Sequence, residues 1–543
     1  MITGLRAVLA LIDNPEMRRL QLAWAAMSFS LWSFAIALGV YAFDLAGAAA
    51  VGIAAFARLL PGALASPFAG LLGDRHSRRS VLVASSLGAS GVLLCAAAGV
   101  AADAPVAIVF ALAGLLMVVS SPYVPAEGAL MPAVARTPQE LTAANVAHSA
   151  MDNAGFLAGS AATGLLLALT NVEVAFGVAA LMAAVCAGLV ARLRRDRRPE
   201  YAGRDAGGVV QETAAGMRAM LADRRLRLIT AALTLLVFFE GAIDVLVVIV
   251  ALDLLDLGEG SVGFLNAAWG VGALAATAPI ALLLHRGGIT AGLVLGCMIA
   301  GASTTLPAAW VAPAAAYLGW IGIGVGYTFV EVAARTLMQR LGSDETLARV
   351  LATLETSRLS AMALGSIAVP VLIALFGVSG ATIAIAAVLP AFALLRWAAL
   401  RSFELGMPVD EQHFALLRGN RIFAPLPVDT LERLANSLVT LAVEPGTAIV
   451  TEGERGDRFY LIASGEVDVF EGSTFRRREV AGECFGEISL LRDVARTATV
   501  RACGDVTLLA LEREHFLAAV TGHRRSRGAA SEVIEERIGT DAG

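Results

Sequence analysis

The sequence predicts an all-α membrane bundle of twelve transmembrane helices, in two pseudo-symmetric six-helix halves, followed by a cytosolic β-roll with flanking helices. Its 543 residues are 57% hydrophobic and only 16% charged, whereas an ordinary globular chain is roughly 45–50% apolar and about 25% charged. A soluble fold needs a polar surface, so this composition excludes a purely soluble, a disordered or a fibrous protein. Long apolar runs repeat as far as residue 400, and short alternating segments broken by glycine begin at Leu438.

Twelve apolar runs have about the 20 residues that a helix needs to cross a bilayer core. They form two groups of six around a polar linker, and the first is too long for a cleavable signal peptide. The expected spans lie near residues 20–43, 47–72, 80–101, 105–124, 146–169, 173–191, 227–250, 261–284, 289–310, 314–333, 353–377 and 379–398. The expected domains are the two transmembrane halves, 1–192 and 227–400, the cytoplasmic linker 193–226 and the soluble domain 401–543.

The arginines predict the orientation, because cytoplasmic loops are enriched in basic residues. All 41 basic residues are Arg, and the absence of Lys is attributed to codon bias. With the amino terminus inside, the inside loops hold many arginines, ten of them between Arg192 and Arg227, and the six short outside loops hold none. We therefore expect a multi-pass protein of a bacterial inner (plasma) membrane, in contact with lipid, with both termini in the cytoplasm.

The five cysteines form no CxxC pair and no cluster with histidine, so neither a disulfide framework nor a metal site is expected. The net charge of −5 gives no reason to expect a nucleic-acid partner. No set of nucleophile and base appears, so the chain is not expected to be an enzyme or to need a cofactor.

The two halves resemble each other in sequence. In segments 129–169 and 336–375, Leu130-Met131 aligns with Leu337-Met338, and a helix rich in small residues follows in both. Internal repeats of this kind are typical of transporters that alternate between two states by rocking one bundle against the other.

The loop between the second and third expected spans carries a specific motif, Gly70-Leu-Leu-Gly73-Asp74-Arg75-His-Ser-Arg78-Arg79. It resembles the signature loop of the major facilitator superfamily, with Ser77 in place of the second glycine of the pattern. The preceding Phe56-Ala-Arg58-Leu-Leu-Pro61 resembles a drug-exporter-like branch. The resemblance covers residues ~15–400 and implies a latch for one conformational state; the alternative is that the charges serve only topology.

Ionisable side chains inside spans are costly and usually face the bundle interior. The candidates for substrate, proton or gate roles are Arg58, Asp152, Asn153, Glu240, Asp244, Glu331, Arg335, Glu355 and Arg358. Glu240 and Asp244 lie one turn apart, so either is a candidate proton carrier or a structural ion-pair partner. For Asp152, Glu355 and Arg358 we favour a gating ion-pair role, and Arg58 is a candidate contact for an anionic substrate or a structural residue.

The most specific motif runs from Phe485-Gly486-Glu487-Ile488-Ser489 to Arg496-Thr497-Ala498. It resembles the phosphate-binding cassette of cyclic nucleotide-binding domains over a core of about 421–525, with Ala495 in place of the usual proline. The resemblance implies that Arg496 contacts the phosphate and Glu487 the ribose 2′-hydroxyl. The chemistry agrees, because a helix that begins near Glu487 offers free N–H groups to an anion and arginine offers a planar fork.

The nucleotide base is less determined. A terminal lid helix of about 526–538 is expected to cover it with Val533, Ile534 and Ile538. Thr497 is compatible with cyclic GMP, as in some relatives, but cyclic AMP is our choice as the commoner bacterial messenger.

These features predict a secondary active transporter of an unidentified small molecule, possibly proton-coupled, regulated by a cyclic nucleotide. The alternative is a non-transporting receptor that responds to cyclic nucleotide and is built on a transporter body. The sequence does not identify the substrate, its direction, the coupling ion or the oligomeric state.

Overall fold

The computed structural model describes residues 14–136, 138–193, 218, 224–285, 288–341, 344–405 and 411–539. Within these ranges some side chains are not described. The chain divides into two compact units, Met1–Arg401 (unit 1) and Ser402–Gly543 (unit 2).

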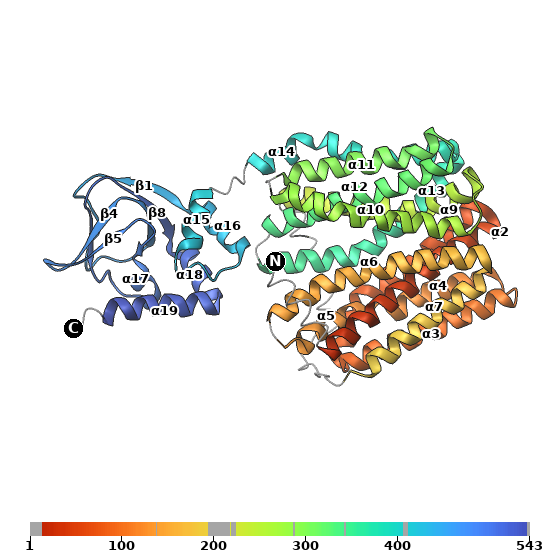
Figure 1. Cartoon of the computed structure of the whole chain (residues 1–543), viewed down its shortest axis with the longest axis horizontal. Helices are drawn as coiled ribbons and strands as arrows, with labels where there is room; N and C mark the ends of the chain where they lie inside the picture. The colour runs from red at the N-terminus through yellow and green to blue at the C-terminus, as the bar shows by residue number, and fades with distance from the viewer. Residues whose placement is uncertain are drawn as a thin grey trace. The chain divides into compact units, whose positions relative to one another are not determined.

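Unit 1 is a bundle of long helices wherever it is described (Figure 1). The helices are α2 (Pro15–Arg75), α3 (Arg78–Ala101), α4 (Val106–Ser120), α5 (Tyr123–Val134), α6 (Pro138–Leu169), α7 (Val172–Ala191), α9 (Arg224–Ile249), the π-helical turn η1 (Val250–Leu254), α10 (Gly260–His285), α11 (Ile289–Ala309), α12 (Pro313–Leu341) and α13 (Asp344–Leu395). The helix α14 (Trp397–Leu405) crosses the boundary to unit 2.

Nine helical segments of the described residues are long and apolar enough to cross a membrane, so the twelve predicted spans are not confirmed by this count. The helices α2 and α13 contain 61 and 52 residues, far more than the roughly 20 that one span needs. Each contains non-helical backbone, at Ala46 and Gly47 in α2 and at Gly377 in α13. Each is therefore two helices joined at a sharp bend, and twelve spans stays a prediction.

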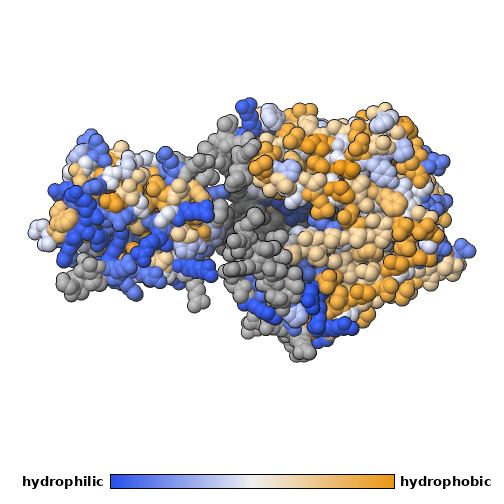
Figure 2. Space-filling model, viewed as in Figure 1, coloured by the Kyte–Doolittle hydropathy of each residue, from blue (hydrophilic) through white to orange (hydrophobic). Residues whose placement is uncertain are grey.

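The face of unit 1 that Figure 2 shows is largely apolar. Leu64, Leu169 and Leu395 are exposed by 67%, 74% and 82%. Large exposed apolar surface is unfavourable in water and fits a lipid environment. Inside, the bundle halves meet where α2 packs on α13 and where α6 packs on α10.

Unit 2 contains two four-stranded antiparallel sheets, as the predicted β-roll requires (Figure 1). One sheet has the order β1-β8-β3-β6 and the other β2-β7-β4-β5. The strands are β1 (Val439–Val443), β2 (Ala448–Val450), β3 (Arg458–Ser464), β4 (Glu466–Glu471), β5 (Thr474–Val480), β6 (Cys484–Phe485), β7 (Thr499–Ala502) and β8 (Val506–Glu512). The helices are α15 (Glu411–Gly419), α16 (Val428–Ser437), α17 (Glu487–Arg492), α18 (Arg513–Gly522) and α19 (Arg524–Gly539).

Two apolar cores stabilise unit 2. The first joins the flanking helices to one sheet around Phe423, Phe459 and Phe516, whose rings contact one another. The second lies between the sheets, where the rings of Tyr460 and Phe485 stack with centroids 5.1 Å apart. Phe485 is thus a core residue that fixes the start of α17.

Candidate functional sites

The turn from β6 into α17 creates a close backbone approach in unit 2. Gly486, the residue before α17, has φ of 92°, a left-handed conformation that favours glycine. A Cβ at this position would lie 2.5 Å from Nη1 of Arg496 and 3.1 Å from the carbonyl oxygen of Arg458. Only glycine therefore allows the start of α17 and the guanidinium of Arg496 to lie side by side.

Arg496 is 6% exposed, and its guanidinium is held by three acceptors. Nη1 donates to the carbonyl oxygen of Gly486 at 3.0 Å and to Oγ of Ser489 at 2.8 Å, and Nη2 donates to the carbonyl oxygen of Arg458 at 2.7 Å. Burial lowers the pKa of Arg496. The nearby Tyr460 and Asp457 act in the opposite direction and raise this pKa, but burial has the larger effect. The result is an oriented cation beside the first turn of α17, an arrangement that suits an anionic phosphate.

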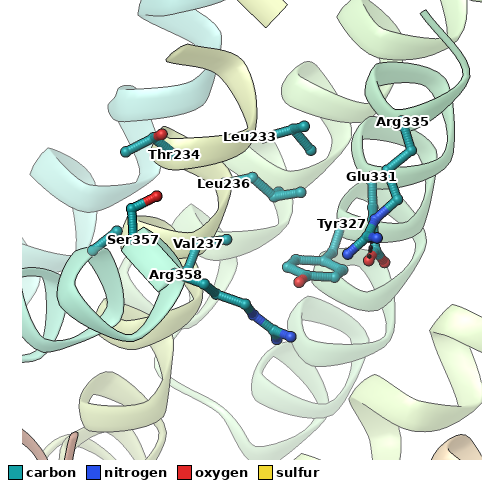
Figure 3. Close-up of a pocket in the computed structure, with 10 residues that line it drawn as sticks. Leu233, Thr234, Leu236, Val237, Tyr327, Glu331, Arg335, Ser357 and Arg358 are labelled. Carbon is teal, nitrogen blue, oxygen red and sulfur yellow. Dashed lines mark ion pairs between the residues drawn. The ribbon is translucent and has the colours of Figure 1, made fainter. Parts of the chain in front are cut away.

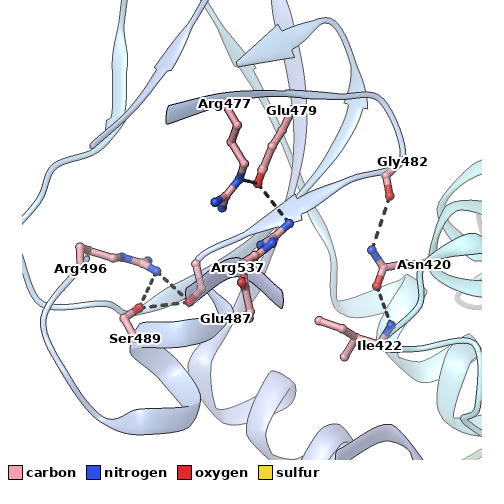
Figure 4. A network of polar contacts seen from close by, with 10 residues as sticks. Asn420, Ile422, Arg477, Glu479, Gly482, Glu487, Ser489, Arg496 and Arg537 are labelled. Atoms are coloured by element: carbon pink, nitrogen blue, oxygen red, sulfur yellow. Dashed lines mark hydrogen bonds and ion pairs between the residues drawn. The ribbon is translucent and has the colours of Figure 1, made fainter. Parts of the chain in front are cut away.

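Glu487 is 1% exposed and pairs with an arginine from the terminal helix (Figure 4). Nη1 of Arg537 in α19 lies 2.5 Å from Oε1 of Glu487, and Nη2 lies 3.1 Å from Oε1 of Glu479 in β5. Burial alone lowers the pKa of Arg537, but the two carboxylates outweigh it and the pKa is raised. Oε2 of Glu487 is buried and accepts no hydrogen bond from the described residues, which leaves it as an acceptor for a hydroxyl.

The remaining residues predicted to contact the nucleotide lie in α17 or in the loop before β7. Ile488 and Ala498 are half-buried, and Thr497 is exposed. Ala495, at the position of the expected proline, forms an isolated bridge with Arg455. This backbone contact holds the loop without the rigidity of a proline ring.

The predicted lid corresponds to α19. Val533 and Ile534 are 8% and 5% exposed, and Val533 belongs to the helix-side core of unit 2. The side chain of Ile538 lies outside the described residues. The terminal helix is thus docked on its own domain through both apolar contacts and Arg537.

In unit 1, two ion pairs connect residues that lie far apart in the sequence. Nη2 of Arg58 in α2 lies 3.7 Å from Oδ2 of Asp244 in α9, and both side chains are nearly buried. This pair joins the two halves of the bundle. Sequence reasoning could not pair these residues, because helix α9 carries no arginine near Asp244 and the partner comes from the other half.

Glu240 is the centre of the second network. Nη2 of Arg358 in α13 donates to both carboxylate oxygens at 3.1 and 3.3 Å, and the hydroxyl of Tyr327 in α12 donates to Oε2 at 2.8 Å. Arg358 and Tyr327 line a cavity in the second half, with Arg358 extending from α13 toward Tyr327 (Figure 3). On α9, the neighbouring Gly241 allows close packing, because a Cβ there would lie 2.1 Å from the carbonyl oxygen of Met362 in α13.

Of the other interior candidates, Glu331 and Arg335 line the same cavity as Arg358 and Tyr327, and Asp152 and Asn153 lie on α6. Asp152 accepts a hydrogen bond from Ser28 at 3.0 Å, and Asn153 donates to the carbonyl oxygen of Ser149 on its own helix. Glu331 and Arg335 form an ion pair of 3.2 Å along α12. The side chain of Glu355 lies outside the described residues. Arg358 therefore pairs with Glu240, and a gating role for Asp152, Glu355 and Arg358 stays a prediction.

The predicted latch motif spans the end of α2 and the start of α3. The side chains of Asp74 and Arg75, and the surroundings of Gly70 and Gly73, lie outside the described side chains. Arg78 donates to the carbonyl oxygen of Ala129 at 2.5 Å, and Arg79 donates to that of Ala191. These two arginines connect α3 to the middle of α5 and to the end of α7.

Sequence reasoning missed a buried polar cluster in the first half. Glu127 in α5 is 1% exposed, and its Oε1 lies 3.3 Å from Nδ1 of His148 in α6. The expected fourth span ended at residue 124, which placed Glu127 in a loop. A turn at Ser121 and Pro122 separates α4 from α5 and interrupts the apolar run. The chain nevertheless continues as a helix, α5, within the bundle.

Comparison with known families agrees with both units. The family described as Major Facilitator Superfamily matches residues 22–366, and the family described as Cyclic nucleotide-binding domain matches residues 440–523. The drug-exporter branch stays a prediction. Two solved transporters share the fold of unit 1: a POT family transporter in complex with a thioalcohol-conjugated peptide (13% identity, TM-score 0.59, 71% of this chain and 96% of that one), and the nucleoside transporter NupG (13%, 0.59, 72% and 99%).

Curated relatives match unit 2. A cAMP-dependent protein kinase regulatory subunit of Yarrowia lipolytica is 42% identical over 88 residues, which are 16% of this chain and 23% of the relative. The corresponding subunit of Candida albicans is 36% identical over 106 residues, 19% of this chain and 22% of the relative. The match thus spans less than a quarter of the length of these relatives.

Proposed function

Because the chain belongs to the major facilitator superfamily and ends in a cyclic nucleotide-binding domain, we propose that it is a secondary active transporter regulated by cyclic nucleotide. It is a multi-pass membrane protein, and we place it in a bacterial inner membrane with unit 2 in the cytoplasm. Its substrate is a small molecule, and the chain itself performs no catalysis. The receptor alternative is not favoured, because the family model that matches unit 1 is that of the Major Facilitator Superfamily.

The observation that carries regulation is the pocket of α17. A fixed guanidinium, that of Arg496, lies beside a helix start, and the buried carboxylate of Glu487 lies on the first turn of the same helix. A cyclic phosphodiester carries one negative charge and a ribose hydroxyl, which these two groups complement. The contacts of Arg496 and Glu487 concern the phosphate and the ribose and do not distinguish adenine from guanine. Cyclic AMP is preferred over cyclic GMP because the curated relatives are regulatory subunits of a cAMP-dependent kinase.

Regulation requires that the nucleotide bind the conformational states of the transporter with different affinities. We propose that ligand binding changes the docking of α19 through Glu487 and Arg537, and that this change biases the transport cycle. Coupling of this kind is reciprocal, so a transported substrate must change the affinity for the nucleotide by the same factor.

The test uses the full chain in lipid nanodiscs. Calorimetry with cyclic AMP and cyclic GMP measures binding, and hydrogen exchange of the unit 1 helices with and without nucleotide measures coupling before any substrate is known. We expect micromolar or tighter binding and altered exchange in unit 1. Binding with unchanged exchange in unit 1 would contradict regulation, and loss of both effects in Arg496→Glu is the required control.

Transport itself is tested by uptake of a small-molecule panel into proteoliposomes. Accumulation of a compound above its equilibrium level under an ion gradient supports active transport. Saturable binding without accumulation across the panel would favour the receptor alternative.

A further inference from the structure

The first half of unit 1 contains a cluster of titratable groups apart from the ion pairs of Arg58 and Arg358. Glu127 (α5) and His148 (α6) form its centre, and the two groups contact each other at 3.3 Å. Asp152 lies four residues after His148, so both occupy one face of α6. Other titratable neighbours are Tyr123 on α5 and Cys186 on α7, whose thiol donates to the hydroxyl of Tyr123 at 3.3 Å.

The carboxylate of Glu127 has few partners for a buried charge. Both of its oxygens are buried and accept no hydrogen bond from the part of the chain that the structure describes. A charged group in the bilayer interior needs a counter-charge or must become neutral. Among the described residues, His148 is the cation-forming group within ion-pair distance of Glu127, so the charge of the acid depends on the protonation of the imidazole.

Asp152 places a second carboxylate near the same imidazole. It accepts a hydrogen bond from Ser28 and lies within electrostatic range of His148, and of Arg358 and Glu240 in the second half. With both acids ionised and His148 protonated, the three groups carry a net charge of −1. One further proton makes them neutral, which is the state that a low-dielectric interior favours.

Two features of His148 favour its protonation: its side chain is partly exposed, and it stacks on an indole ring. The side chain of His148 is 28% exposed, whereas that of Glu127 is 1% exposed, so a proton can reach the acid through the imidazole. The indole of Trp24 stacks on the imidazole with centroids 4.8 Å apart, and an aromatic face attracts a cation.

We propose that Glu127 and His148 form a proton-binding site in the first half of the bundle, with Asp152 as its second acid. The role of this proton in driving transport rests on the proposed function. The proton binding itself does not, because it requires neither a substrate nor a nucleotide. Proton binding at this site is reversible, and only bonds to the proton form or break.

Fluorescence of Trp24 provides the test, since an imidazolium quenches a stacked indole more strongly than a neutral imidazole does. The full chain in nanodiscs keeps Trp24 and has its other five tryptophans replaced by Phe. We expect quenching on acidification that is absent in His148→Gln. In Glu127→Gln the midpoint should fall by about one pH unit or more, a tenfold loss of proton affinity.

A matched control is Glu173→Gln, which removes an acid at the start of α7 and should leave the midpoint unchanged. Size-exclusion profiles verify folding; if Glu127→Gln does not fold, Asp152→Asn should also lower the midpoint. The same midpoint in the wild type and in the folded acid variant, or titration that persists in His148→Gln, would overturn the site. Failure of nucleotide regulation would leave this result unaffected.

Discussion

Arg496 shows how a single buried cation prepares a site. Its guanidinium is fixed by three uncharged oxygen acceptors. None of these three acceptors is a carboxylate that would neutralise its positive charge. Asp457 lies 4.0 Å away, and its side chain is 77% exposed. The cation is therefore oriented but not neutralised, and a phosphate that enters meets donors that need little rearrangement.

We expect Arg496→Lys to weaken cyclic nucleotide binding by at least tenfold. A lysine keeps the charge but cannot donate to three fixed acceptors in a planar fork and still reach the phosphate. Calorimetry on the full chain measures the effect, and Arg501→Lys on the exposed face of β7 is the matched control. Equal loss in both variants would show that the pocket does not depend on the fork.

Glu479 predicts a pH dependence of the stability of unit 2. It is 2% exposed, and burial raises its pKa above the ordinary value of 4.5 despite Arg537 and Arg477 nearby. The folded state therefore holds this proton more tightly than the unfolded state. The stability gained from protonation is complete below 4.5 and is lost as the pH rises through the folded-state pKa.

In consequence, the wild type should gain free energy of unfolding relative to Glu479→Gln as the pH falls from neutrality toward 4.5. Urea unfolding of the full chain, followed through a probe in unit 2 at several pH values, measures this difference. A difference that is constant with pH, or that changes in the opposite direction, would contradict the raised pKa.

At the scale of elements, Arg537 joins the terminal helix α19 to the start of α17 and to β5. Arg537 contacts Glu487, which begins α17, and Glu479, which lies in β5. Three elements far apart in the sequence thus meet at one cation. Any ligand that bonds to Glu487 changes the electrostatic environment of the residue that docks the terminal helix.

Arg537→Ala leaves two buried carboxylates without this cation. Breaking a buried ion pair by removing one partner costs about 3 kcal/mol or more, so we expect a loss of stability of that size and faster hydrogen exchange in α19. Arg527→Ala is the control, because Arg527 is an exposed residue of the same helix and such changes cost within about 0.5 kcal/mol. Equal effects of the two substitutions would show that the pair does not dock α19.

The sequence predicted elements better than contacts. The strands of unit 2 and the helix start at Glu487 follow from local patterns of glycine and alternating residues, which are short-range signals. Glu127 was missed because the expected fourth span ends at residue 124, whereas the helical path continues in α5 as far as Val134. Arg537 was missed because a lid over a nucleotide base is expected to use apolar side chains, and the acidic partner Glu487 lies 50 residues away in the sequence.

At the scale of the molecule, the two halves were predictable and their connections were not. The internal repeat indicated two related bundles, but no periodicity links Arg58 with Asp244, which are separated by most of the first half and the linker. Such a pair is a product of tertiary packing between α2 and α9. Its position between the halves makes it a candidate contact that must break when the bundles rock.

The role of the Arg58–Asp244 pair in holding the halves together can be tested by removing one of its charges and then by exchanging the two. We expect Asp244→Asn to favour separation of the halves, because Arg58 is left buried without its partner. A cysteine introduced at Ala55, which lines the same cavity as Arg58 and Asp244, reports the opening through its rate of labelling by a soluble maleimide. The rate should rise by about tenfold, which corresponds to about 1.4 kcal/mol.

The double variant Arg58→Asp/Asp244→Arg restores an ion pair with opposite polarity. If the pair holds the halves together, this variant should label more slowly than Asp244→Asn and approach the wild type. If both variants label equally fast, the two residues stabilise their own helices and do not bridge the halves. The swap thus separates a contact between bundles from local packing, since local roles depend on the identity of each side chain and a bridge depends on the complementarity of the two.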